Sequence, residues 1–266
     1  MPATAVTPVH RPRVVVLDLD GVVWLSLQPI RGSAEAVAAM RAAGIEVLFA
    51  TNNSAPRVAD HEQALAAIGI PAEGWVITSA QAASMLVQPG ERALVVGGPG
   101  LHEALEARDA TVVDERADVV VVGLDRQFTY DTLRRASTEV RNGARLLASN
   151  DDATYPTPDG PIPGGGAMLA AVATAAGVTP VIAGKPHQPM ADLVLARSGG
   201  ATPDQIVMVG DRPETDGLFA RRIGCRYAQV RTGVVPAGVH VALADIDQAD
   251  LLGVANVLLT DGGLSS

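Results

Sequence analysis

The stretch "VVVLDLDGVVW" (residues 14–24) places two aspartates, Asp18 and Asp20, at the end of an apolar run. The run of β-branched residues predicts a fully buried strand. Side chains alternate along a strand, so both carboxylates lean the same way at its end. Their repulsion costs on the order of a few kcal/mol, and burial beside an apolar sheet adds a desolvation cost. A hard divalent cation offsets both, and Mg²⁺ is the usual one where oxygen ligands handle phosphate.

The composition limits the classes of function. The chain has 266 residues, 48% of them hydrophobic, which is enough for one large domain or two moderate ones with a sizeable core. The formal net charge is −9, and no Lys/Arg cluster exceeds a pair, which disfavours nucleic-acid and membrane partners. A single cysteine, Cys225, excludes an internal disulfide. No secretory or membrane-spanning pattern is present, so we expect a cytoplasmic protein.

Strands and helices alternate along the chain and predict an α/β fold with a Rossmann-like parallel core sheet and helices on both faces. Strand patterns at residues 13–20, 45–54 and 75–80 alternate with helical patterns at residues 34–43 and 58–69. A second α/β alternation then runs to a Pro/Gly/Asp-rich loop at residues 151–166, before the first resumes. We therefore expect a flexible tail (residues 1–12), a core (13–79 and 183–260) and an inserted α/β cap (80–182).

Polar residues also follow the other core strands. Thr51, Asn52 and Asn53 end "VLFATNN", and Asp211 ends "IVMVGD". Lys185, in "AGKP", lies where a helix is about to begin. In open α/β sheets, ligands bind beyond the carboxyl ends of the strands. Each residue alone fits a turn, a helix cap or a solvated loop, but together they indicate a site for a metal and an anionic substrate.

The motifs "DLDGVVW", "TNNS", "GKP" and "GDRPETD" resemble the haloacid dehalogenase superfamily. The chain is most similar to the capped phosphatases, a branch that includes p-nitrophenyl, phosphoglycolate, pyridoxal and glycerol phosphate phosphatases. "VVGLDRQFTYDTL" and "SNDDATYP" also resemble this branch. The resemblance implies an Mg²⁺-dependent phosphatase that hydrolyses phosphomonoesters of small metabolites through an aspartyl-phosphate. It leaves the physiological substrate open.

The resemblance also implies roles for individual residues. Asp18 would be the nucleophile, because a carboxylate needs no base to activate it, and Asp20 would be the general acid and then the general base. Mg²⁺ would be held by the carboxylates of Asp18 and Asp211 and by the backbone carbonyl of Asp20. Thr51 and Lys185 would hold the phosphoryl oxygens. The helpers expected around them are the backbone N–H groups of Leu19, Asp20, Asn52 and Asn53, the cap residues Asn150 and Asp152, and Asp216, which supports either the metal or Lys185.

Alternatives from other classes stay open at this point. A receiver-like phosphoacceptor signalling protein also uses acidic residues, a Thr and a Lys, but needs only about half this length. A phosphoryl-transfer mutase would require a bisphosphate activator. The segment "LSLQPI" (residues 25–30) departs from the basic residue and glycine usual in the family, which puts the leaving-group preference in doubt. Caps of this branch often mediate dimers, so the resemblance also suggests a homodimer.

Overall fold

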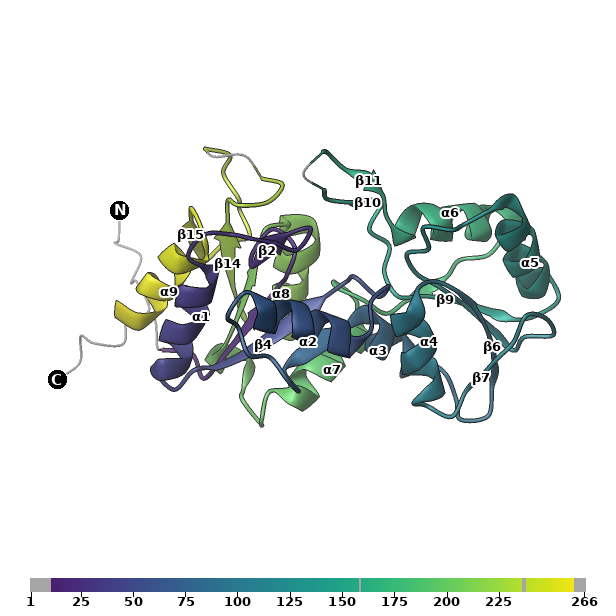
Figure 1. Cartoon of the computed structure of the whole chain (residues 1–266), viewed down its shortest axis with the longest axis horizontal. Coiled ribbons are helices and arrows are strands. Elements are labelled where there is room, and N and C mark those ends of the chain that lie inside the picture. The colour runs from purple at the N-terminus through teal and green to yellow at the C-terminus, as the bar shows by residue number, and fades with distance from the viewer. Residues whose placement is uncertain (1–10, 158, 236–237, 261–266) are drawn as a thin grey trace, which may run out of the picture.

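The apolar run before Asp18 forms strand β1 (Val14–Leu17), which lies inside a six-stranded parallel sheet (Figure 1). The computed structural model describes residues 11–157, 159–235 and 238–260, so most of the expected N-terminal tail lies outside the described residues. The order of this core sheet is β15-β14-β13-β1-β4-β5. The other strands are β4 (Glu46–Thr51), β5 (Val76–Thr78), β13 (Ile206–Gly210), β14 (Arg226–Val230) and β15 (Ile246–Gln248).

The register of the sheet brings the polar strand ends together. Leu17 of β1 lies opposite Val209 of β13 and Phe49 of β4. Since all three strands are parallel, the residues that follow them, including Asp18 and Asp211, emerge at one edge. This edge is where the sequence predicted the site.

Alternate residues of β1 pack into two different layers. Val15 and Leu17 belong to the cluster that contains α1 (Ser33–Ala42), α2 (Val58–Ala67) and α9 (Leu251–Thr260). Val14 and Val16 belong to the cluster that contains α3 (Ser79–Ser84), α7 (Gln188–Arg197) and α8 (Leu218–Ile223). The core sheet is thus covered on both faces, which explains why β1 is apolar at every position.

A second parallel sheet of five strands is inserted between β5 and α7, in the order β12-β9-β8-β6-β7. Helices α5 (Tyr130–Arg141) and α6 (Gly165–Ala176) cover one face, and α4 (Pro99–Glu106) and α3 join the other face to the core cluster. The predicted fold class is confirmed; the cap boundaries at residues 80–182 stay our proposal. The strands are β6 (Arg92–Val96), β7 (Thr111–Val112), β8 (Val119–Val122), β9 (Arg145–Ala148) and β12 (Val181–Ile182).

Two small hairpins were not predicted, and both lie at the mouth of the site. Strands β2 (Trp24–Leu25) and β3 (Gln28–Pro29) form a hairpin that we call the flap, with positive φ at Ser26 and Leu27. Strands β10 (Thr154–Tyr155) and β11 (Ile162–Pro163) form a second hairpin within the segment predicted as a loop. It extends from the cap toward the core (Figure 1). The remaining short elements are the 3₁₀-helix η1 (Pro203–Gln205) and the π-helix η2 (Pro213–Gly217).

In the described part of the chain, no helix is both long and apolar enough to cross a membrane. Its longest helices, α5 and α6, have 12 residues each, against the roughly 20 that a bilayer span requires.

The cap approaches the core closely at Gly100, in the first turn of α4. Its N–H donates to the carbonyl of Ala55 at 2.9 Å. A Cβ at Gly100 would lie 1.9 Å from the carbonyl oxygen of Pro56. We predict that Gly100→Ala lowers the free energy of unfolding by about 1–3 kcal/mol, because backbone must move to admit the methyl group. Chemical denaturation measures this change.

Gly253 is the matched control, because it also lies within a helix. A Cβ there would first meet the flexible end of Gln248, at 3.0 Å. Alanine also gains about 1 kcal/mol of helix propensity over glycine. Gly253→Ala should therefore leave the stability within about 1 kcal/mol of the parent. Equal stability of the Gly100→Ala and Gly253→Ala variants would contradict the tight approach.

Candidate active site

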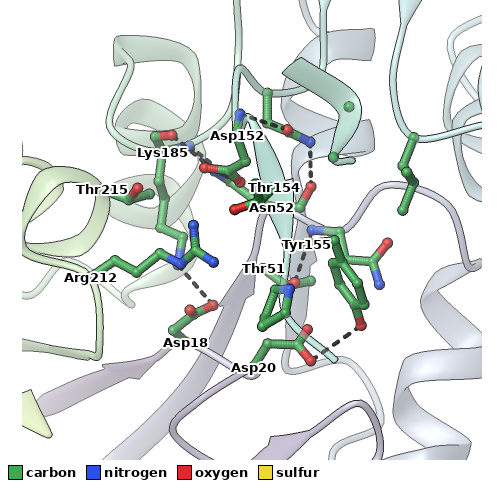
Figure 2. Close-up of a pocket in the computed structure, with 16 residues that line it drawn as sticks. Asp18, Asp20, Thr51, Asn52, Asp152, Thr154, Tyr155, Lys185, Arg212 and Thr215 are labelled. Carbon is green, nitrogen blue, oxygen red and sulfur yellow. Dashed lines mark hydrogen bonds and ion pairs between the residues drawn. The ribbon is translucent and has the colours of Figure 1, made fainter. Parts of the chain in front are cut away.

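The ammonium group of Lys185 is buried between two carboxylates. Its Nζ lies 2.9 Å from Oδ1 of Asp18 and 2.7 Å from Oδ1 of Asp216, and the side chain is 1% exposed. Burial lowers the pKa of Lys185, but the charges of Asp18 and Asp216 more than offset this, so the net pKa is raised. Lys185 therefore carries a positive charge, and its side chain lies along one side of the site and reaches Asp18 (Figure 2).

Asn52 holds the backbone of Lys185 in place from the end of β4. Lys185 N–H donates to Oδ1 of Asn52 at 2.8 Å, and Nδ2 of Asn52 donates to the Lys185 carbonyl at 3.0 Å. Asp216 is held from the other side, because its Oδ2 accepts the N–H of Arg212 at 3.2 Å. The ion pair thus joins the end of β1, the segment before α7 and helix η2, and the Asn52 hydrogen bonds add the end of β4.

A third carboxylate, Asp211, completes an acidic cluster. Ligand atoms of Asp18, Asp211 and Asp216 all lie within 4.8 Å of one another. Oδ2 of Asp211 accepts the N–H of Val234 at 2.9 Å, whereas its buried Oδ1 has no hydrogen-bond partner among the described residues. Burial raises the pKa of Asp211, and the charges of Asp216 and Asp18 raise it further.

This cluster fits a divalent cation. Three carboxylates lie around one buried ammonium group, so the cluster carries an excess of negative charge. Oδ1 of Asp211, which has no hydrogen-bond partner among the described residues, is available as a metal ligand. Carboxylate oxygens are the ligands that Mg²⁺ prefers. The backbone leaves room for Asp211, since a Cβ at Gly21 or Gly233 would lie 2.6 or 1.9 Å from an atom of its side chain.

Asp20 turns toward the cap instead of toward Lys185. Its Oδ1 accepts the hydroxyl of Tyr155 at 3.2 Å and the N–H of Ser26 at 3.4 Å. Burial raises the pKa of Asp20 to about 7, and the charge of Asp18 adds to the rise, while hydrogen bonds from Tyr155, Ser26 and Trp24 oppose it. A carboxyl group with a pKa near neutrality can both donate and accept a proton.

The loop after β4 is held rigidly by side chains. Thr51 Oγ1 accepts the N–H of Asn53 at 3.0 Å, so this predicted phosphate-binding N–H is engaged with Thr51. The Asn52 carbonyl accepts hydrogen bonds from Ser79 and Asn150, each at 2.7 Å. The buried His61 hydrogen-bonds the Asn53 carbonyl at 3.2 Å. A loop held this firmly suits a site that must keep its phosphate-binding groups in fixed positions.

A pocket lies above Lys185, between the core and the cap (Figure 2). Asp211 and Asp216 do not line this pocket; they lie beside Asp18, which does, in the acidic cluster. Leu19 is fully buried and does not line the pocket either. The predicted site residues that line the pocket are Asp18, Asp20, Thr51, Asn52, Asn53, Asn150, Asp152 and Lys185.

Two cap residues connect the cap to the loop after β4. Oδ2 of Asp152 accepts Nδ2 of Asn52 at 2.9 Å, and Nδ2 of Asn150 donates to the Asn52 carbonyl. Burial raises the pKa of Asp152. The hydrogen bond from the Asn52 amide and the charge of Arg212 offset part of this rise. Asn150 and Asp152 were expected to contact the substrate; in the structure they line the pocket and join cap and core.

The sequence analysis missed four polar lining residues, Thr154, Tyr155, Arg212 and Thr215. Arg212 directly follows Asp211 and adds a second cation to the pocket (Figure 2). Tyr155 lies in "SNDDATYP", a stretch quoted for its family resemblance, but no residue-level signal pointed to its partner Asp20.

Comparisons with known proteins identify the family of this chain. Residues 15–111 match a family model described as haloacid dehalogenase-like hydrolase, and residues 182–251 match a HAD-hydrolase-like model. An acid sugar phosphatase of Staphylococcus saprophyticus is 34% identical over 232 residues, covering 84% of this chain and 87% of that protein.

Solved structures of similar proteins have the same fold. A double mutant of a thermostable NPPase from Geobacillus stearothermophilus is 31% identical with a TM-score of 0.84, covering 91% of this chain and 98% of that one. A glycerol phosphate phosphatase from Mycobacterium tuberculosis, in complex with magnesium, is 31% identical with a TM-score of 0.82. The match covers 93% of this chain and 78% of that chain.

We predict that Mg²⁺ raises the melting temperature of the protein and that Asp211→Asn abolishes the shift. A ligand at 100 times its dissociation constant stabilises the folded state by about 2.7 kcal/mol, and the variant removes a charged ligand while keeping its size. Thermal unfolding with and without Mg²⁺ measures this effect. The exposed Asp192 of α7 is the matched control, and Asp192→Asn should keep the shift. A full shift in Asp211→Asn would contradict the assigned site.

Proposed function

The chain belongs to the haloacid dehalogenase-like hydrolases, and we propose that it hydrolyses phosphomonoesters of small metabolites with Mg²⁺. The observation that carries the proposal is the buried ion pair of Lys185 with Asp18 and Asp216, next to Asp211. Phosphatases are among the relatives of this chain, and we assign it phosphomonoesterase activity. Asp18, Asp211 and the backbone carbonyl of Asp20 would hold the Mg²⁺.

In the first step, Asp18 attacks the phosphorus atom. The bond from phosphorus to the leaving oxygen breaks, and a bond from phosphorus to the Asp18 carboxylate forms. Lys185 orients the nucleophile through its 2.9 Å contact and, with Thr51, binds the phosphoryl oxygens as their charge spreads. Asp20 gives its proton to the departing alkoxide. When bound, Mg²⁺ would neutralise charge among the carboxylates and the phosphoryl group.

In the second step, water attacks the phosphorus of the aspartyl-phosphate. Asp20, now deprotonated, takes a proton from this water, and the bond between phosphorus and Asp18 breaks to release inorganic phosphate. The position of Asp20 beside Asp18, with its carboxyl group turned toward the pocket, supports this double role. The cap excludes bulk water from the first step.

The pocket supports sugar or polyol phosphates as the substrate class. Asp152 offers a carboxylate that can accept hydrogen bonds from hydroxyl groups, and Thr154 adds a polar lining residue. An acid sugar phosphatase and a glycerol phosphate phosphatase among its relatives favour the same class. The receiver-like and mutase alternatives gain no specific support from this pocket.

We predict that Asp18→Asn lowers kcat at least about a thousandfold on every substrate, because the amide cannot serve as the nucleophile. The assay is phosphate release from a panel of sugar phosphates, glycerol phosphate and p-nitrophenyl phosphate. Asp192→Asn should match the parent. Phosphatase activity retained in Asp18→Asn would refute the nucleophile.

We also predict that EDTA removes the activity and that added Mg²⁺ restores it, because the acidic cluster would otherwise repel the anionic substrate. The same panel serves as the assay, after dialysis against the chelator. Full activity in a preparation shown by elemental analysis to be free of metal would count against the proposed Mg²⁺ site of Asp18, Asp211 and the Asp20 carbonyl.

A further inference from the structure

The flap and the β10–β11 hairpin of the cap meet directly above Asp20. Tyr155, from β10, donates its hydroxyl to Oδ1 of Asp20 at 3.2 Å (Figure 2). Ser26, in the turn of the flap, donates its N–H to the same oxygen at 3.4 Å and its own hydroxyl to the Pro156 carbonyl at 3.0 Å. A residue of the cap thus touches the carboxyl group that would transfer the proton.

We propose that Tyr155 is a positioning residue, which orients the Asp20 carboxyl group for protonation of the leaving group while the cap is closed. This inference rests on the proposed function, because it acts through the acid–base role of Asp20. It adds a residue that contributes to the reaction from the cap.

The hydrogen bonds around Asp20 support this role. The terminal torsion of an aspartate is broad and roughly two-fold, so a carboxyl group without firm partners has no fixed orientation. Both bonds to Oδ1 are slightly longer than usual, the Ser26 bond against 2.7–3.2 Å for an N–H donor and the Tyr155 bond against 2.5–3.0 Å for a hydroxyl donor, so neither donor alone fixes the carboxyl group. Trp24 contributes a further side-chain hydrogen bond. Tyr155 and Ser26 both donate to Oδ1, so the cap and the flap act together on the same carboxylate oxygen.

The same contacts couple the chemistry to the position of the cap. Tyr155 and Asp20 lie 135 residues apart in sequence, Tyr155 in β10 of the cap hairpin and Asp20 in the loop after β1. If the β10–β11 hairpin leaves the flap, Asp20 loses the Tyr155 hydrogen bond. The acid is then correctly oriented only when the substrate is enclosed. Substrates with good leaving groups, which need little protonation, should be insensitive to this contact.

The test compares two leaving groups in Tyr155→Phe, which removes only the hydroxyl. kcat/KM reports the steps through the first phosphoryl transfer, where the leaving group departs. For glycerol phosphate, a poor leaving group, we expect kcat/KM to fall about tenfold, as for the loss of one hydrogen bond in the transition state. For p-nitrophenyl phosphate we expect less than about a threefold change. A merely structural role would lower both values by the same factor.

Three further variants complete the experiment. Asp20→Asn should show the same leaving-group selectivity with a larger loss of kcat/KM. That loss is the upper limit for the loss expected in Tyr155→Phe. Tyr130→Phe, on an α5 side chain that is 81% exposed, should match the parent. Ser26→Ala removes the hydroxyl that anchors the hairpin, so it should shift the ratio of the two kcat/KM values in the same direction by a smaller factor. If Tyr155→Phe does not fold, this ratio in Ser26→Ala decides.

The outcomes separate the two proposals. An equal loss on both substrates, or no loss on either, overturns the role of Tyr155 and leaves the phosphatase assignment intact. A parent protein that hydrolyses neither of these substrates nor any sugar phosphate of the panel contradicts the proposed function, and the role of Tyr155 with it; if only sugar phosphates are hydrolysed, the one turned over fastest replaces glycerol phosphate as the poor leaving group. A selective loss on glycerol phosphate supports both.

Discussion

A single buried ammonium group, that of Lys185, stabilises the carboxylates around which this site is built. Its contacts with Asp18 and Asp216 join three chain segments that are far apart in sequence. Charges so deeply buried cost several kcal/mol each unless they are paired, so the local fold depends on this ion pair. One ammonium cannot balance Asp211 as well, and this deficit is why the site suits a divalent cation.

The positions of the main site residues could be predicted because parallel strands end at a common edge. Asp18 and Asp211 each follow an apolar strand and Thr51 ends one, and the register of β1 with its neighbours brings them together. The sequence left two roles open for Asp216, and the 2.7 Å contact with Lys185 supports one of them, while its place in the acidic cluster leaves the other available.

Contacts made by irregular segments could not be predicted in the same way. The segment 151–166 has no hydrophobic periodicity, so its hairpin and the contact from Tyr155 to Asp20 were missed. The role of the Asn52 side chain was missed as well, since its partners Asp152 and Lys185 lie 100 and 133 residues away. The contacts of Tyr155 with Asp20 and of Asp152 with Asn52 connect the cap to the core, so an open cap would disturb both the general acid and the phosphate-binding loop.

The central claim is that the Asp18 carboxylate accepts the phosphoryl group. Rapid mixing of the Asp20→Asn variant with p-nitrophenyl phosphate and Mg²⁺, followed by acid quench and peptide mass spectrometry, tests it most directly. Because this variant lacks the base for the second step, we expect one phosphoryl group on the peptide that contains Asp18, in amounts matching the burst of p-nitrophenol. A phosphoryl group on another residue, or a burst without a phosphorylated peptide, would contradict the account.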